Sequence, residues 1–435
     1  MDINFKSVSA LVIICITLLG LIITNIFFNK IKITKRLALS TFWIVPLIGA
    51  ILLICFQDVS MNNFWTIITA NNSVNPLKVI ALFFSMTLLS IFLDEIGFFS
   101  YLANFFARKI NKNQFILFFG LYILISILTV FTSNDIIILT FTPFVISFCK
   151  KSKIDPLPYL IMEFISANTM SMCLIIGNPT NIYLATSFNI DFIAYFKTMI
   201  IPTLLASFTS ILLLFLLFFK KLKMPITPYN GSENKPNKLL LTIGLTILLG
   251  TTILLAISSY INIEMWIVAI AGAGIELVFL IAYSLIKKDN IVIRVLKHIP
   301  YNLLPFILSM FILVLSLQEI GFSSLLANAF NSICPTFTYG YSGILAANLI
   351  NNIPMSLLYG SILDGTNIKA IYASIAASNI AAYITPLGAL AGLMFISLCK
   401  KDDVKISFIQ FIKYGVIVGI PTITISLLLI NFLNF

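Results

Sequence analysis

The sequence predicts an all-α polytopic membrane protein, made of two inverted repeats with about 10 transmembrane helices and two re-entrant hairpins with broken helices. Hydrophobic residues make up 60% of the 435 residues and charged residues only 10%, whereas soluble domains carry roughly 25% charged residues. Apolar runs of about 20 residues, long enough to cross the hydrocarbon of a bilayer, recur from end to end. The lipid bilayer is therefore the first expected partner.

A repeated segment divides the chain into two halves. Residues 93–106 (LDEIGFFSYLANFF) and 317–330 (LQEIGFSSLLANAF) agree at 10 of 14 positions. Duplicated halves are typical of secondary transporters whose solute site lies between the repeats. We therefore expect a first repeat over 1–219, a cytoplasmic linker over 220–238 and a second repeat over 239–435.

The basic residues predict the topology. The formal net charge is +11, but Lys and Arg gather in short clusters between apolar runs. We interpret these clusters as cytoplasmic topology signals and expect no nucleic-acid partner. On this basis 23 of the 27 basic residues lie inside and both termini lie outside. The first apolar run has no small-residue cleavage site, which favours a retained helix over a signal peptide.

Each predicted helix of the first half is an apolar run that ends at a polar or basic segment. The runs cover 8–28, 39–57, 77–94, 156–177 and 198–219. A polar outer loop over 58–76 follows the second run, and an amphipathic cytoplasmic stretch through 112 follows the third. Because five spans is an odd number and the linker crosses no membrane, the second half is expected to run in the opposite direction.

The segment 114–149 does not fit a single span. It is mostly apolar, yet basic clusters flank both of its ends, and its middle reads Thr132-Ser133-Asn134-Asp135. Polar backbone at membrane depth is tolerated only where it is packed in protein or lines a wet cavity. A hairpin that enters from the cytoplasm and turns at 133–135 explains both observations.

The second half repeats this order of elements. Its predicted helices cover 238–258, 264–286, 302–318, 372–398 and 411–431, with an outer amphipathic stretch over 320–332. A second hairpin, about 336–362, turns at Asn351-Asn352. The matched order agrees with an inverted repeat.

Glycine and proline within apolar segments predict broken helices over 156–190 and 372–398. The stretches SANTMSMCLIIGNPTN and ASNIAAYITPLGALAG each place an asparagine, Asn168 or Asn379, nine residues before a glycine. Proline removes a backbone donor and glycine permits unwinding. Freed carbonyls can then bind a cation, and a restarting half-helix can bind an anion or a polar neutral solute.

The hairpin tips and helix breaks together form the predicted solute and ion site. Its residues are Ser133, Asn134, Asp135, Asn168, Gly177, Asn178, Pro179, Thr180, Asn181, Asn351, Asn352, Pro354, Ser378, Asn379, Thr385, Pro386 and Gly388. Proline kinks solvated by neighbouring side chains are the alternative for any single motif, but four motifs paired across a repeat favour a site. The six cysteines have no CxxC spacing, so we expect no metal site.

Two acids within apolar segments are candidates for carrying a coupling proton. Asp135 lies at the first hairpin tip and Glu163 lies about one turn before Ala167-Asn168. An unpaired charge is costly inside a membrane, which makes such residues functional candidates. The alternative is a hydrogen-bonded structural acid that caps a half-helix. Glu95 and Glu319 recur between the halves at the start of interfacial stretches, where we expect a structural role.

These motifs resemble the ion-transporter superfamily that includes arsenite permeases of the ArsB type, sodium/proton antiporters and divalent-anion/sodium symporters. The segment 133–143 resembles its first hairpin tip, and 177–181 (GNPTN) resembles its first helix break. The segments 351–355 and 378–388 resemble arsenite permeases most closely, and the similarity covers roughly residues 40–430.

The resemblance implies ion-driven, elevator-like or rocking exchange of a site at the repeat interface. Dicarboxylate symporters carry Ser-Asn-Thr at both hairpins, whereas Asp135 stands third here and the second hairpin has no such triplet. We therefore expect proton-coupled efflux of arsenite or antimonite. The alternatives are a sodium-coupled symporter of a small inorganic or organic anion (citrate, dicarboxylate or sulfate type) and a sodium/proton antiporter.

Other functional classes are disfavoured. An intramembrane enzyme needs a nucleophile–base pair, metal-binding histidines or facing aspartates, whereas the only histidine, His298, lies in a basic loop and is expected to be solvated. No GxxxxGK[ST] motif is present, so the chain is not itself an ATPase. We expect no cofactor beyond H⁺ or Na⁺ as coupling ion, and a bacterial inner-membrane location. A second copy of the chain and a cytoplasmic ATPase subunit are further partners to consider.

Overall fold

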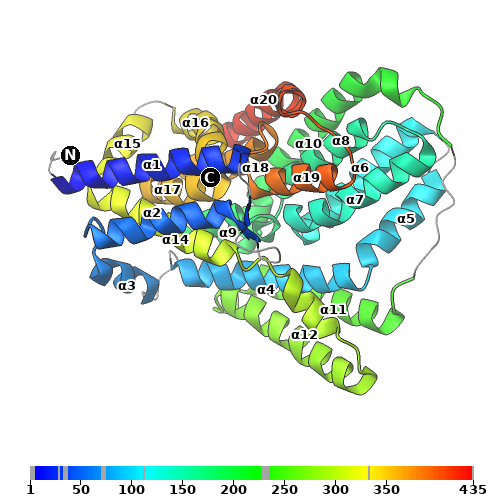
Figure 1. The fold of residues 1–435 in the computed structure, drawn as a ribbon, viewed down its shortest axis with the longest axis horizontal. Helices are drawn as coiled ribbons and strands as arrows, with labels where there is room; N and C mark the ends of the chain where they lie inside the picture. The colour runs from blue at the N-terminus through cyan, green and yellow to red at the C-terminus, as the bar shows by residue number, and fades with distance from the viewer. Residues whose placement is uncertain are drawn as a thin grey trace.

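Helices account for nearly all of the computed structural model (Figure 1), which describes residues 5–27, 30–32, 38–69, 75–110, 113–227, 235–331 and 334–433. Eight helical segments in these ranges are long and apolar enough to span a bilayer. This confirms the all-helical polytopic fold, although about 10 spans were predicted. The predicted span over 39–57 is a shorter helix, Thr41–Cys55, whereas Gln114–Phe131, predicted as one arm of a hairpin, is long enough to span. The basic positions Lys35, Arg36 and Lys112, and residues 228–234 of the predicted linker, lie outside the described residues.

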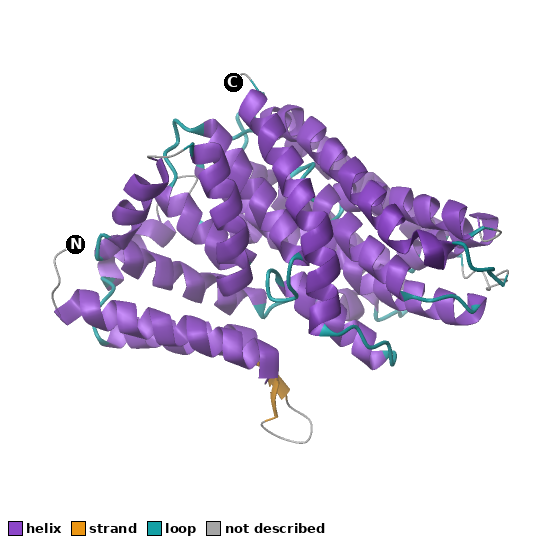
Figure 2. Cartoon of the chain, turned by 90° about the horizontal axis from the view of Figure 1, so that it is seen from above, coloured by secondary structure: helices purple, strands orange, loops and turns teal. Residues whose placement is uncertain are grey.

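The first half begins with two apolar helices, of 23 and 15 residues, joined by a short antiparallel strand pair, which projects from the helical body in Figure 2. Its first elements are α1 (Phe5–Phe27), β1 (Lys30–Lys32), β2 (Ala38–Ser40), α2 (Thr41–Cys55), α3 (Met61–Thr69), α4 (Pro76–Glu95) and α5 (Phe98–Ile110). The predicted polar loop over 58–76 was wrong in part, because the short helix α3 lies within it.

The residues at the two ends of α4 explain where this helix begins and where it ends. Asn75 caps its start by accepting a hydrogen bond from the Leu77 N–H, and Pro76 stands at the first helical position, where no backbone donor is needed. After its end, Gly97 has a φ of +80°. Gly321 has a φ of +75° after the matching helix of the second half. Only glycine adopts this conformation without strain, so the repeated Glu-Ile-Gly motif ends both helices in the same way.

The rest of the first half contains the hairpin and the broken helix. Its elements are α6 (Gln114–Phe131), α7 (Asn134–Ser152), α8 (Leu157–Met170), the 3₁₀ turn η1 (Ile175–Gly177), α9 (Pro179–Ser187) and α10 (Phe192–Leu222). Helix α6 ends and α7 begins within the polar stretch 132–134, so the backbone turns where the sequence predicted.

The second half follows the same order. Its elements are α11 (Lys238–Ile257), α12 (Met265–Lys287), α13 (Ile291–His298), α14 (Leu303–Glu319), α15 (Phe322–Asn331), α16 (Pro335–Ile350), α17 (Asn352–Ile362), α18 (Ile368–Ile380), η2 (Ala381–Tyr383), α19 (Leu390–Lys401) and α20 (Phe408–Phe432). Helix α13 was not predicted. It is amphipathic: Ile291 and Val295 are buried, and the basic residues of its last turn face outward.

The two halves are interleaved. Helix α2 packs on α14, α4 packs on α12, and α10 packs on α20, so each of these contacts joins a helix of one half to a helix of the other. In Figure 1, α4, α11 and α12 lie along the lower edge, while α18 and α19 lie near the middle of the molecule. Long helices of the two halves therefore pack directly on each other.

The repeated glutamates join the halves at two matching places. At the end of α4, the Glu95 carboxylate lies 2.5 Å from His298 Nδ1 and 3.4 Å from Arg294 Nε, both on α13. At the end of α14, the Glu319 carboxylate accepts hydrogen bonds from the Ser60 N–H (3.3 Å) and from Asn63 Nδ2 (2.9 Å), beside and within α3. Each glutamate therefore holds a short helix that belongs to the other half.

Candidate functional site

The first hairpin tip presents polar groups inside the protein. Ser133 is extended and caps α7. The adjacent Asn134 donates a hydrogen bond from Nδ2 to Asn168 Oδ1 at 2.9 Å. Its other polar atom, Asn134 Oδ1, is buried and has no hydrogen-bond partner among the described residues. Buried polar atoms are nearly always paired, so a free acceptor at this place is unusual.

The first broken helix is produced by a close backbone approach. A Cβ atom at Gly177 would lie 2.3 Å from the Ser171 carbonyl oxygen, so only glycine fits. The chain restarts as α9 with Pro179 at its first position and Asn178 as its cap, which accepts the Thr180 N–H at 3.1 Å. The predicted break is therefore present, with each motif residue in a definite local role.

The second broken helix has the same construction. A Cβ atom at Gly388 would lie 2.3 Å from the Ala381 carbonyl oxygen. Between η2 and α19, the Thr385 N–H donates to Asn348 Oδ1 (3.0 Å), and the Leu387 N–H donates to Thr385 Oγ1 (3.2 Å). Pro386, which lacks a donor, stands between them. Asn348 on α16 supports this segment and was not among the predicted site residues.

The side chain of Asn379 joins the two broken helices. Its Oδ1 accepts hydrogen bonds from Ser171 Oγ (2.7 Å) and Asn178 Nδ2 (3.0 Å). Its Nδ2 donates to Asn181 Oδ1 (2.7 Å) and to the Ile375 carbonyl (2.8 Å). Next to it, Ser378 and Thr180 share a hydrogen bond of 2.9 Å between their hydroxyls. All these polar side chains are buried, so the predicted residues of the two halves meet directly.

Ser171 extends this network to the first hairpin. Its hydroxyl lies within hydrogen-bond distance of the Asn168 carbonyl (2.8 Å) and of Asn379 Oδ1 (2.7 Å). Asn168 in turn receives the hydrogen bond from Asn134 at the hairpin tip. Ser171 was not among the predicted site residues, although its place between Asn168 and Gly177 could have indicated it.

The second hairpin tip is docked on the second broken helix. Asn351 has a φ of +79° and its Nδ2 donates to the Leu387 carbonyl at 3.3 Å. The Asn352 N–H donates to the Gly388 carbonyl (2.9 Å), and Asn352 Nδ2 donates to the Ser378 carbonyl (3.3 Å). Pro354 is buried in the first turn of α17. These contacts connect the second tip to the same network.

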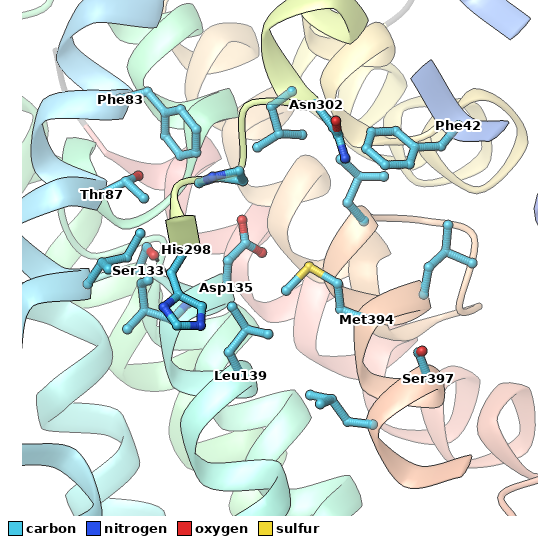
Figure 3. A pocket seen from close by; sticks show the side chains of 17 residues that line it. Phe42, Phe83, Thr87, Ser133, Asp135, Leu139, His298, Asn302, Met394 and Ser397 are labelled. Atoms are coloured by element: carbon cyan, nitrogen blue, oxygen red, sulfur yellow. Dashed lines mark hydrogen bonds between the residues drawn. The ribbon is translucent and has the colours of Figure 1, made fainter. Parts of the chain in front are cut away.

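A cavity of about 350 Å³ lies beside the first hairpin tip. Of the predicted site residues, only Ser133 and Asp135 line it; the others lie in the network behind it or at the second tip. Figure 3 shows the Asp135 carboxylate pointing into the space among Phe83, Asn302 and Met394. The wall comes from α4, α7, α19 and the segment before α14, so both halves contribute to it.

The cavity reaches the surface near His298, which the sequence assigned to a solvated loop. The side chain of His298 is 64% exposed, but it also contacts Glu95 and forms part of the cavity wall. The exposure agrees with the expectation that His298 is solvated, but the expected loop was wrong, because His298 ends the helix α13.

The two candidate acids occupy different surroundings. Asp135 lines the cavity and makes no hydrogen bond or ion pair with another described residue. Glu163 is fully buried behind the hairpin, where its Oε1 accepts a hydrogen bond from Thr142 at 2.9 Å. The other oxygen, Oε2, has no partner in the described part of the chain. Of the two acids, only Asp135 lines the cavity.

A much smaller cavity of about 20 Å³ lies at the corresponding place near the second hairpin. Helices α9 and α17 line it, and in chain order these match α19 and α7 of the large cavity. Phe83 lines both cavities. Corresponding elements of the two halves thus line a large cavity beside the first hairpin and an almost filled one beside the second.

Comparison with known proteins agrees with this architecture. The chain is 26% identical over 371 residues to the arsenical pump membrane protein of Escherichia coli, covering 80% of this chain and 84% of that protein. It is 27% identical over 368 residues to the protein of the same description from Yersinia enterocolitica, with the same coverage. In structure it is similar to the YdaH transporter of Alcanivorax borkumensis, with a TM-score of 0.58, 13% identity and 98% coverage of both chains.

Because the identity to YdaH is low, the structural similarity shows a shared fold alone. The family assignment rests on the sequence pattern of the citrate transporter family, which matches residues 33–376 and therefore most of the chain. The same residues contain both predicted hairpins and the first helix break. This chain is thus a multi-pass membrane transporter that belongs to the citrate transporter family.

Proposed function

We propose that this chain is a secondary active transporter of the bacterial inner membrane that exports arsenite or antimonite, driven by protons. The arsenical pump membrane proteins named above support this solute class. The observation that carries the proposal is the composition of the large cavity. None of the described residues that line it is Lys or Arg, whereas Asp135 projects into it.

The cavity suits a small neutral solute better than an anion. A carboxylate and mostly apolar walls disfavour an anion, since no lysine or arginine of the described lining offsets its charge. Arsenite is the neutral trihydroxide As(OH)₃ at neutral pH, and its hydroxyls can donate hydrogen bonds. The acceptor that the hairpin tip presents to the cavity is the Asp135 carboxylate.

Asp135 is the proposed proton carrier. A carboxyl that faces a solute cavity within a membrane can bind a proton when the cavity opens to one side and release it on the other. Because Asp135 has no fixed partner among the described residues, proton and solute can compete for the same oxygen atoms. Glu163 is the second candidate, placed behind the hairpin rather than in the cavity.

The unequal cavities support exchange of the site between the two sides of the membrane. The large cavity lies on the side of α13, which the basic residues assign to the cytoplasm. Its counterpart at the second hairpin is nearly filled. In an inverted repeat, each half can adopt the conformation of the other, which would close the large cavity and open the small one. We propose that the repeats 1–219 and 239–435 exchange in this way.

Arsenite accumulation tests the proposal. Cells that lack their own arsenite pumps are compared with and without this protein, before and after collapse of the proton gradient. Lower accumulation that is lost on collapse is expected. Asp135→Asn should abolish the effect while the protein stays in the membrane, and full activity of that variant would exclude Asp135 as the proton carrier. Asp364→Asn is the matched control, because Asp364 is an exposed turn residue whose capping an asparagine can replace.

A sodium-coupled carrier of a small anion is the second candidate, favoured by the family match. Helix α9 begins at the helix break, where the positive end of its dipole can attract an anion. Unchanged arsenite accumulation, with the protein confirmed in the membrane, would support this candidate. Sodium-dependent uptake of labelled citrate into proteoliposomes would then be measured.

A further inference from the structure

A second buried acid lies apart from the proposed solute site. Glu276 stands midway along α12 and has no exposed surface. Both of its carboxylate oxygens lack a hydrogen-bond partner among the described residues. It lines neither the large cavity nor the small one. The transport mechanism proposed above gives this residue no role.

The helices around Glu276 offer it no counter-charge. Helix α12 packs on α4, α11 and α13, and Figure 1 shows it beside α4 and α11 at one edge of the molecule. Apart from Glu276, the charged and titratable groups of these helices stand in or next to their first or last turns: Lys78, Asp94, Glu95, Lys238, Tyr283, Lys287, Arg294, Lys297 and His298.

Several of these groups have partners elsewhere. Lys78 pairs with Glu264 at 2.6 Å, and Glu95 contacts α13 as described above. Asp94 faces Thr140 of α7. Closer to Glu276, the buried face of α12 carries only small or apolar residues, and its Gly272 packs against the Thr251 side chain of α11.

This environment favours the neutral form of the carboxyl. An ionised carboxylate inside a membrane protein persists when it has an ion partner or several hydrogen-bond donors. Glu276 has neither within the described part of the chain. A bound proton removes the charge and leaves only a neutral polar group to be buried. The observations that favour a bound proton are thus complete burial and the lack of a partner for either oxygen.

We propose that Glu276 is a proton-binding site, separate from the solute site, whose occupied form belongs to the conformation described here. Helix α4 connects the two places, because it packs on α12 and also supplies Phe83, Thr87 and Ile91 to the cavity wall. Loss of the proton requires water or a donor to enter between α12 and its neighbours. A conformation that admits water or a donor next to Glu276 binds the proton more weakly. By thermodynamic linkage, release of the proton then favours that conformation, and a movement of α4 that opens this space favours release of the proton.

The link to transport rests on the proposed function, whereas proton binding itself is testable without any solute. Infrared spectra of the purified protein in lipid nanodiscs report the carbonyl stretch of protonated carboxyl groups. At neutral pH, Glu276→Gln should remove one such band. Glu264→Gln is the matched control at the start of the same helix, and it should remove none, because Lys78 donates a hydrogen bond that lowers the pKa of Glu264. An unchanged spectrum for Glu276→Gln would overturn the proposal.

Glu276→Met tests the same idea through stability and guards against a glutamine variant that fails to fold. Methionine fills a similar volume without a charge, so its melting temperature should equal or exceed that of the wild type. Since a neutral buried carboxyl stabilises the fold less as the pH rises, the gap should widen with pH. A methionine variant that melts below the wild type at every pH would contradict a neutral Glu276. If Glu276→Gln loses the band but the wild-type protein does not transport arsenite, this inference holds and the proposed function is rejected.

Discussion

Removal of the Asn379 side chain tests whether the buried polar network holds the two repeats together. Asn379→Ala deletes four hydrogen bonds of 2.7–3.0 Å, three of which reach the first broken helix. Ser171 keeps its bond to the Asn168 carbonyl. Asn178 Nδ2 and Asn181 Oδ1 each lose their bond to Asn379, and both side chains are buried.

Two bounds give the size of the effect. Interhelical hydrogen bonds in membrane proteins contribute about 0.6 kcal/mol each on average, so the three that reach the first broken helix give roughly 1.8 kcal/mol. Two buried groups left without partners cost about 1–3 kcal/mol each, or roughly 2–6 kcal/mol together. We therefore expect Asn379→Ala to lower the free energy of unfolding by about 2–6 kcal/mol.

Thermal unfolding of purified protein in nanodiscs measures this loss, and transport is assayed on the same samples. Thr209→Ala is the control, because the Thr209 hydroxyl is exposed and bonds only the Leu205 carbonyl of its own helix. Asn379→Asp separates shape from polarity: it keeps the volume but replaces a donor that serves Asn181 Oδ1 with an acceptor. If Asn379→Ala has the same melting temperature as Thr209→Ala and transports normally, the network does not join the repeats and the reasoning is refuted.

Three further predictions concern other parts of the fold. Gly388→Ala should abolish folding or transport, because its Cβ would lie 2.3 Å from a backbone carbonyl, whereas Gly274→Ala meets nothing within 4 Å and should behave as wild type; size-exclusion profiles and transport rates compare the two. Glu95→Arg should weaken the contact between α4 and α13, and adding Arg294→Glu should restore it. Because Arg294 is half exposed, a double-mutant cycle should give a coupling energy of about 0–1 kcal/mol. Because Lys78 holds the pKa of Glu264 below its ordinary value, that contact stabilises the protein above the ordinary glutamate pKa and is lost as the pH falls through the lower folded value. The melting temperature of the wild type should therefore fall more steeply than that of Glu264→Gln below about pH 4, and parallel curves would refute this assignment.

The sequence by itself determined the membrane architecture. Apolar run length predicts most of the span-length helices, and the polar stretch at 132–135 predicts the break between α6 and α7, because both are local properties of the chain. Gly177 and Gly388 predict the helix breaks for the same reason. The inverted orientation of the two repeats and the placement of the termini stay predictions from the basic residues.

The tertiary structure decided which of these residues meet. Local pattern assigns Asn168 and Asn379 the same role, yet packing gives Asn379 the bonds that join both broken helices and gives Asn168 the contact with the hairpin tip. It also selects Ser133 and Asp135 from the predicted set to line the open cavity, and brings His298 to its wall through α13. Such contacts join residues as many as 208 positions apart. Distances of that kind depend on how the long helices of the two halves pack, which no local pattern encodes.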